Sequence, residues 1–254
     1  MPASDETPLV TLDNSSGVRR VLVVTAHPDD VDFGAAGTVA KWVAAGAEVA
    51  YCVATDGDAG GSDRSMTRSA MAEMRREEQR KAAAEVGVSE VTFLGYSDGK
   101  LAPTIELRRD VSRVVRAWRP ELLVCQSPER NWDRIGASHP DHLAAGEAAV
   151  CAAYPDARNP FAHPELLEEG LEPHSVAELW LMASPRPNRA VDITETFGRK
   201  LAALSCHESQ VVHEVDLEGR LRRMASAGAP LVGAPEGTLF ELFQVVSMPS
   251  SGSS

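Results

Sequence analysis

The chain has 254 residues, of which 43% are hydrophobic and 24% charged, a balance typical of a soluble globular protein with a sizeable core. Its formal net charge of −12 argues against nucleic acid and anionic membranes as partners, because both select for basic surfaces. The sequence has no apolar run near the roughly 18 residues that span a bilayer, and its first residues lack the basic start and apolar stretch of a signal peptide.

The first half of the chain alternates apolar, β-rich runs with helical patterns. The predicted strands cover residues 20–26, 48–57, 91–95 and 121–127. The predicted helices cover residues 34–46, 67–86, 105–118 and 138–153. This βαβ alternation predicts an α/β fold in which helices cover both faces of a mostly parallel sheet.

After residue 155 the alternation weakens. Residues 155–173 are rich in proline and acidic residues and are predicted to form a long loop. We expect this loop to form one wall of the entrance to the functional site, because long loops in compact domains are usually functional or disordered. Further strands are predicted at residues 177–182 and 238–246, and further helices at residues 194–205 and 216–227.

The pattern predicts a single domain over residues 18–248, with flexible tails at residues 1–17 and 249–254. The four cysteines are far apart in the sequence and form no CxxC pair. Cys52 and Cys125 fall inside predicted strands, where cysteine behaves as a small buried hydrophobe. This usage predicts a reduced, cytoplasmic protein.

Polar residues follow each of the first four predicted strands. His27, Asp29 and Asp30 follow the first strand, and polar segments at residues 56–61, 95–99 and 127–142 follow the others. In an open α/β sheet, ligands bind beyond the carboxyl ends of the strands. These segments therefore predict one functional site at that edge of the sheet.

The residue types at this edge predict a catalytic metal. A catalytic zinc has three nitrogen or oxygen ligands and one open position for water, and His27, Asp30 and His142 supply such a set. We expect one zinc ion per chain, with another divalent ion such as Fe²⁺ as the alternative. Asp29 would take a proton from a water whose pKa the metal lowers to about 7. His139 would donate a proton or stabilise an oxyanion.

The second segment also has a purely structural explanation. Ser138 can cap the predicted helix, with Asp141 three residues later as in a capping box. That explanation does not account for His139 and His142, which share a helix face at i, i+3. The remaining histidines are expected at the surface or in loops: His163, His174, His207 and His213.

The two histidine segments carry a resemblance to a known family. "AHPDDVDFGAAGTVA" and "SHPDHLAAGEA", together with "RREEQRKAAAEVGV" and "VDITETFGRKLAALSCHESQ", resemble the PIG-L/LmbE-like zinc-dependent N-deacetylases from about residue 19 to 210. Val31 and Asp32 make the first segment similar to the HPDDVE subgroup, which includes bacillithiol-type deacetylases. The resemblance implies a Rossmann-like layered sandwich and hydrolysis of an N-acyl, most often N-acetyl, group from a small amino-sugar conjugate.

The resemblance also implies roles for single residues. His27, Asp30 and His142 match the metal ligands, Asp29 the general base and His139 the electrophilic or acid histidine. Asp141 matches an acid that orients this histidine. Some members place a catalytic tyrosine two residues before that histidine. Ala137 stands there in this chain, so the role is vacant or falls to His139.

Four residues are expected to contact the substrate. Arg75 and Asp98 match positions that contact the sugar in some members of the family, and Arg130 and Asn131 are expected to line the pocket. Each of the first two also has a structural explanation. Arg75 can pair with Glu78 at i, i+3, and Asp98 can serve as a turn residue.

Three other functions stay open. The same residues could cleave a larger amide, such as a thiol conjugate or an antibiotic acyl group. A dinucleotide-binding oxidoreductase is disfavoured, because the first βα turn lacks GxGxxG. A metal-binding protein without catalysis is disfavoured by Asp29. The expected partner is a small N-acylated molecule, and the sequence leaves a homo-oligomer open.

Overall fold

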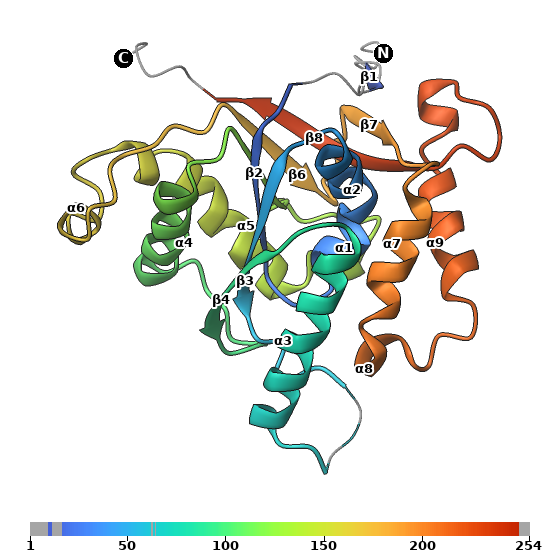
Figure 1. Ribbon diagram of the computed structural model, residues 1–254, viewed down its shortest axis with the longest axis horizontal. Helices are drawn as coiled ribbons and strands as arrows, with labels where there is room; N and C mark the ends of the chain where they lie inside the picture. The colour runs from blue at the N-terminus through green and yellow to red at the C-terminus, as the bar shows by residue number, and fades with distance from the viewer. Residues whose placement is uncertain (1–9, 12–16, 62, 64, 249–254) are drawn as a thin grey trace.

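One eight-stranded sheet forms the centre of the protein, and helices cover both of its faces (Figure 1). The computed structural model describes residues 10–11, 17–61, 63 and 65–248. The strand order is β1-β7-β8-β6-β5-β2-β3-β4. The strands are β1 (Val10–Thr11), β2 (Arg20–Thr25), β3 (Glu48–Thr55), β4 (Glu90–Tyr96), β5 (Leu122–Gln126), β6 (Glu178–Met182), β7 (Arg189–Asp192) and β8 (Phe240–Ser247). All neighbouring strands are parallel except that β8 is antiparallel to β6 and β7, which confirms the predicted mostly parallel sheet.

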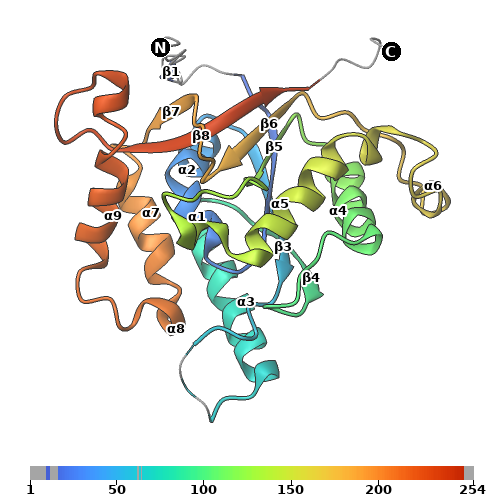
Figure 2. The same ribbon diagram turned by 180° about the vertical axis from the view of Figure 1, so that it is seen from behind.

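The helices form a layer on each face of the sheet (Figures 1 and 2). One face packs against α2 (Ala36–Ala44), α3 (Arg68–Glu85), α7 (Phe197–Ser205) and α9 (Leu217–Ser226). The other face packs against α4 (Ile105–Trp118) and α5 (Pro140–Ala153). The short helices are α1 (Asp30–Gly34), α6 (Glu165–Glu168) and α8 (Glu208–Val211), with 3-10 turns at Ile135–Ser138, Asp156–Arg158 and Pro230–Val232. Among the described residues, none of these helices has the length and apolar character to cross a membrane.

Strand β2 shows why the apolar runs of the sequence form a central sheet. Val21 and Val23 pack into the core on one face, while Leu22 and Val24 pack into the core on the other, and all four are fully buried. Because successive side chains of a strand point to opposite faces, a strand covered on both sides must be apolar throughout.

Two predicted elements differ in the structure. The helix predicted over residues 34–46 begins later, at Ala36, as α2, and a separate short helix, α1, precedes it at Asp30–Gly34. The buried carboxylate of Glu241, on β8, accepts the main-chain N–H groups of Gly37 and Thr38 and so satisfies the first turn of α2. Within the predicted N-terminal tail, residues 10–11 form β1, while residues 1–9 and 12–16 and the predicted tail at 249–254 lie outside the described residues.

The sheet topology creates a switch point beside β2. From β2 the chain builds β3 and β4 on one side, then crosses over and builds β5 and β6 on the other. The connections that leave β2 and β5 therefore diverge at the carboxyl ends of the two strands. This divergence is where open α/β sheets bind ligands.

The segment from Pro155 to Pro173 packs on the outer flank of α4, away from this edge (Figure 1). The guanidinium of Arg116, on α4, is buried and donates to main-chain carbonyls of Asp156, Ala157, Asn159, Ala162 and Leu171. Beyond the segment, His174 lies 2.7 Å from the Pro120 carbonyl, at the amino end of β5. The prediction that this segment forms a wall of the site is wrong, because α5 carries the chain back to the opposite edge first.

Arg116→Met is expected to lower the free energy of unfolding by about 3 kcal/mol, because it removes the donor of several carbonyls that are covered by protein. Urea unfolding followed by circular dichroism measures this change. Arg119→Met is the matched control, since Arg119 is exposed on the same helix end and its bond to the segment, to the Pro173 carbonyl, is long at 3.4 Å. A loss below about 1 kcal/mol for Arg116→Met would show that the segment is held by other contacts.

Candidate metal centre and active site

The HPDD segment forms a tight turn between β2 and α1. The carboxylate of Asp30 accepts the main-chain N–H of His27 at 2.7 Å, which closes the turn. Asp29 lies between them with φ 89°, a left-handed conformation that is uncommon outside glycine and that Asn and Asp tolerate best. Non-glycine residues in such conformations cluster at functional sites.

The three predicted metal ligands lie together at the switch point. The Asp30 carboxylate is 3.0 Å from His142 Nε2 and 3.4 Å from His27 Nδ1. Donor atoms of His27, His139 and His142 all lie within 4.8 Å of one another. The turn after β2 and the first turn of α5 thus bring nitrogen and oxygen donors to a single point.

His142 presents Nε2 to this point because its other ring nitrogen is occupied. His142 Nδ1 lies 3.2 Å from the carbonyl oxygen of Ala137. A carbonyl can only accept, so Nδ1 carries the proton and Nε2 is left with a lone pair for a cation. Ala137 therefore contributes its backbone carbonyl to the site.

His27 is oriented by two further carboxylates. Its Nε2 lies 3.2 Å from Asp98 and 3.3 Å from Asp141, so Nδ1 is the nitrogen on the side of Asp30. Asp141 is buried and accepts the N–H groups of Gly99 and Leu101. His27, Asp98 and Asp141 also form a group whose atoms lie within 4.8 Å. Because backbone donors already engage both carboxylates, we assign them to holding His27, as carboxylates commonly do behind a metal-bound imidazole.

The start of α5 differs from the predicted capping box. His139 is the N-cap residue, and its Nδ1 accepts the main-chain N–H of Asp141 at 3.2 Å. Ser138 instead accepts the N–H of Asn131 at 2.8 Å and holds the preceding loop. The cap therefore fixes the ring of a histidine beside the cluster.

The predicted base lies against Arg75. The guanidinium of Arg75 is buried, 3.2 Å from the Asp29 carboxylate, and donates to the carbonyls of Pro28 and Gly57. The Glu78 carboxylate accepts from Ser209, so the alternative that Arg75 pairs with Glu78 does not describe these contacts. Burial raises the pKa of Asp29 to about 6, with Arg75 opposing the rise. A carboxylate with a pKa near 6 can accept a proton close to neutrality.

The electrostatics of the cluster fit a divalent cation. Burial alone would lower the pKa of His27, but Asp30 and Asp98 raise it to about 10. Burial works against the charge of Asp30, yet His142 and His27 hold its pKa well below the usual range. The carboxylates therefore favour positive charge on the histidines. A cation bound to these donors would take the place of the protons on the imidazole rings.

The loop before α5 holds the two remaining predicted pocket residues. Asn131 is buried, and its side-chain oxygen accepts the N–H of Arg134. Arg130 is exposed, and its guanidinium lies 5.5 Å from the ring of Trp132, which is 78% exposed. Asn131 therefore shapes the loop, while Arg130 and Trp132 present side chains at its surface.

His207 is the site-adjacent residue whose burial the sequence did not indicate. It is fully buried, and its Nε2 lies 2.8 Å from the Asp32 carboxylate. Of the other histidines, His213 is exposed, whereas His163 and His174 are partly buried beside Asp156 and Pro120. His207 does lie in a loop, the connection between α7 and α8, but it is not at the surface.

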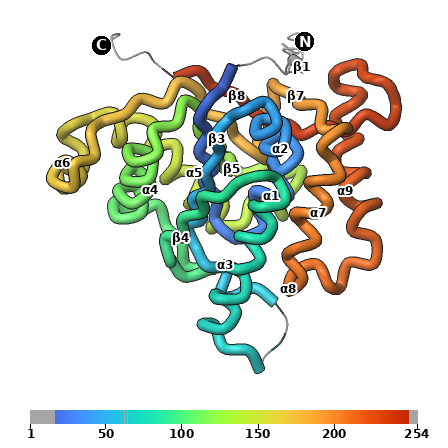
Figure 3. The backbone as a smooth tube through the Cα atoms, viewed as in Figure 1, coloured from blue at the N-terminus to red at the C-terminus, as the bar shows by residue number. Residues whose placement is uncertain are grey.

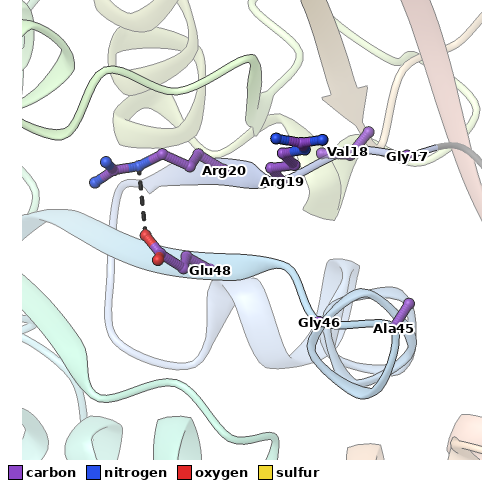
Figure 4. Close-up of a pocket in the computed structure, with 7 residues that line it drawn as sticks. All are labelled: Gly17, Val18, Arg19, Arg20, Ala45, Gly46 and Glu48. Atoms are coloured by element: carbon purple, nitrogen blue, oxygen red, sulfur yellow. Dashed lines mark ion pairs between the residues drawn. The ribbon is translucent and has the colours of Figure 1, made fainter.

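Two depressions lie away from the cluster. One of about 520 Å³ is lined by Gly17, Val18, Arg19, Arg20, Ala45, Gly46 and Glu48, at the amino ends of β2 and β3 (Figure 4). It lies at the edge of the sheet opposite the donors, and its ion pair joins Arg20 to Glu48 at 3.5 Å. The other, of about 700 Å³, runs between α3 and α8 and is lined in part by Met66, Met71 and Met74.

The chain is similar to known proteins in sequence and in fold. A family model described as "PIG-L: GlcNAc-PI de-N-acetylase" matches residues 22–153. The chain is 33% identical over 202 residues to the diacetylchitobiose deacetylase of Thermococcus kodakarensis, covering 78% of this chain and 72% of that protein. It is 29% identical to a probable N-acetyl-alpha-D-glucosaminyl L-malate deacetylase 2 of Bacillus anthracis, covering 78% and 84%. The structure of N,N'-diacetylchitobiose deacetylase from Pyrococcus horikoshii matches with a TM-score of 0.83 and 29% identity, covering 91% and 85%.

Proposed function

The chain belongs to the PIG-L family, and we propose that it is a metal-dependent hydrolase that removes the acetyl group from a small N-acetylglucosamine conjugate. The observation that carries the proposal is the convergence of His27, Asp30 and His142 beside the half-buried carboxylate of Asp29. Ligands and base are the parts that metal-assisted amide hydrolysis needs.

We propose that His27, Asp30 and His142 hold one divalent cation. Zinc suits a set of two imidazoles and one carboxylate, and Fe²⁺ is the alternative. A bound cation of this kind polarises the acetamide carbonyl and lowers the pKa of a water molecule.

Asp29 is the proposed proton acceptor. Its carboxylate is held by Arg75 and takes the proton of the attacking water. His139 is the proposed donor: burial and the charges of His27 and His142 lower its pKa, so the ring is neutral near pH 7. Because its Nδ1 accepts from the backbone, the proton lies on Nε2, from which it can donate a hydrogen bond to the oxyanion. The proton that Asp29 takes from the water then passes to the departing amine.

The proposed substrate contacts differ in exposure. Arg75 and Asp98 are buried and bonded to protein groups, so their proposed action on the substrate runs through Asp29 and His27. Arg130 is exposed and can contact a sugar directly, with Asn131 setting the course of its loop.

The test is a substrate panel. N,N'-diacetylchitobiose, N-acetylglucosaminyl malate and N-acetylglucosaminyl inositol are incubated with zinc-loaded and with chelator-treated protein, and mass spectrometry follows the loss of acetyl groups. An N-acylated thiol conjugate and an acylated antibiotic test the larger amides. We expect a free amine from at least one sugar, with the zinc-loaded protein only. Absence of product throughout the panel, or equal rates without metal, would contradict the proposal.

Gly60→Ala is expected to lower kcat by about tenfold while the metal is retained. A Cβ at position 60 would overlap the Arg75 guanidinium, which must then move from the Asp29 carboxylate. Steady-state kinetics and elemental analysis measure the two quantities. Gly198→Ala is the matched control, because a Cβ there meets open space. An unchanged kcat in Gly60→Ala would show that the contact between Arg75 and Asp29 does not matter for turnover.

Two broader points also remain proposals. Residues 18–248 act as one domain, a proposal supported by the single sheet to which strands β2 to β8 all belong. The location is cytoplasmic, a proposal that rests on four cysteines that form no disulfide.

A further inference from the structure

Two side chains of helix α3 form hydrogen bonds to the carbonyl and the N–H of one peptide group, next to the proposed base Asp29. Arg75 donates to the carbonyl of Pro28 at 2.7 Å, and the Gln79 side-chain oxygen accepts the N–H of Asp29 at 2.8 Å. These two groups belong to the same peptide bond, and Arg75 and Gln79 lie one turn apart on the helix. The two hydrogen bonds therefore hold the backbone at the point where Asp29 adopts its positive φ.

The orientation of Gln79 is fixed from behind by Asp32 and His207. Gln79 Nε2 donates to the Asp32 carboxylate at 2.9 Å, and His207 Nε2 lies 2.8 Å from the same oxygen. A carboxylate can only accept, so the amide nitrogen of Gln79 must face Asp32 and its oxygen must face Asp29. All three side chains are completely buried, so water cannot replace these bonds without a rearrangement.

His207 reaches this position from the far end of the chain. It lies in the connection between α7 and α8, and Figure 3 shows this connection beside α3. Ser209, on α8, fastens this connection to α3, because its N–H and hydroxyl both donate to the Glu78 carboxylate. His207 is thus held rigidly, although it contacts none of the proposed metal ligands.

We propose that His207 is a positioning residue that acts through Asp32 and Gln79 to hold the Pro28–Asp29 peptide and hence the carboxylate of Asp29. The inference rests on the proposed role of Asp29 as the base. Without the His207 bond, the Asp32 carboxylate and the Gln79 amide can rotate and release the Asp29 N–H. The metal ligands are held by other groups: His27 by Asp98 and Asp141, and His142 by the Ala137 carbonyl.

The test is a double-mutant cycle on the zinc-loaded protein, with the panel substrate that turns over fastest. His207→Leu is expected to lower kcat by about 10–100-fold, with KM changed by less than about twofold and the zinc content retained. In the Asp29→Asn background, the same change is expected to cost less than about twofold, because the group that His207 positions is gone. His207→Gln is expected to restore most of kcat, since its amide nitrogen can donate to Asp32.

A second readout needs no activity. Hydrogen exchange of the metal-free protein, measured on peptides that contain Asp29, is expected to be faster in His207→Leu and in Gln79→Leu than in the wild type. His174→Leu is the matched control, because His174 is a partly buried histidine bonded to Pro120 away from the site. It is expected to leave kcat, zinc content and this exchange unchanged.

The outcomes separate the inference from the proposed function. Full kcat in His207→Leu, loss of its zinc, or an equal loss of kcat in both backgrounds would overturn the inference. Full turnover of Asp29→Asn alone would instead overturn the proposed base. If His207→Leu does not fold, Gln79→Leu takes its place in the same cycle, with the same expected result.

Discussion

Asp29→Asn is expected to lower kcat by about 10²–10⁴-fold and to leave the metal content unchanged, because a general base typically contributes that much. Asparagine keeps the size of the side chain and tolerates the positive φ at this position. It can still lie beside the guanidinium of Arg75, but it cannot take a proton. Steady-state kinetics and elemental analysis of the same preparation measure both quantities.

Asp30→Asn is the comparison variant, because it changes the proposed metal ligand instead of the proposed base. Asp30 lies between His27 and His142, whereas Asp29 turns toward Arg75. Substitution of the two neighbouring acids should therefore affect different quantities, the metal affinity for Asp30 and kcat for Asp29. Asp30→Asn is expected to weaken metal affinity, and added zinc should restore part of the activity. Loss of metal from Asp29→Asn with retention in Asp30→Asn would mean that the roles are exchanged. Full turnover by Asp29→Asn would place the base elsewhere.

Much of the fold could be predicted because its signals are local. The boundaries of α4 match the predicted residues 105–118, since Thr104 caps the helix and Arg119 ends it before Pro120. The cluster could be predicted because its members sit in two short segments that directly follow strands of a parallel sheet. The strands that precede the two segments, β2 and β5, are neighbours in the sheet, so the segments meet at its carboxyl edge.

The features that were missed depend on partners far away in the sequence. The position of His207 follows from its bond to Asp32, 175 residues earlier, and nothing in its own neighbourhood indicates burial. The route of the segment after Pro155 follows from the Arg116 guanidinium on α4. Strand β7 has four residues, too few for a period-2 pattern, and exists because β8 pairs with it. Burial of polar groups is a tertiary property, so periodicity does not reveal it.

His142→Ala is expected to reduce metal affinity by more than about 100-fold, and with it nearly all activity, because a catalytic site depends on three protein ligands. The substitution removes the Nε2 atom that faces Asp30 at 3.0 Å. Elemental analysis and zinc titration against a competing chelator measure the loss. Circular dichroism checks that α5 still forms, since alanine is well tolerated near a helix start.

His139→Ala decides whether the assignment of the third ligand is right. His139 also places a donor atom within 4.8 Å of His27 and His142, so geometry alone offers two candidates. His139 is the more exposed of the two, and its Nδ1 is engaged by the backbone of α5, whereas His142 Nε2 is directed at Asp30. His139→Ala should therefore keep the metal and lose kcat, while His142→Ala loses both. The reverse pattern of metal retention would make His139 the ligand, and the hydrogen bond to the oxyanion would then have to come from another group.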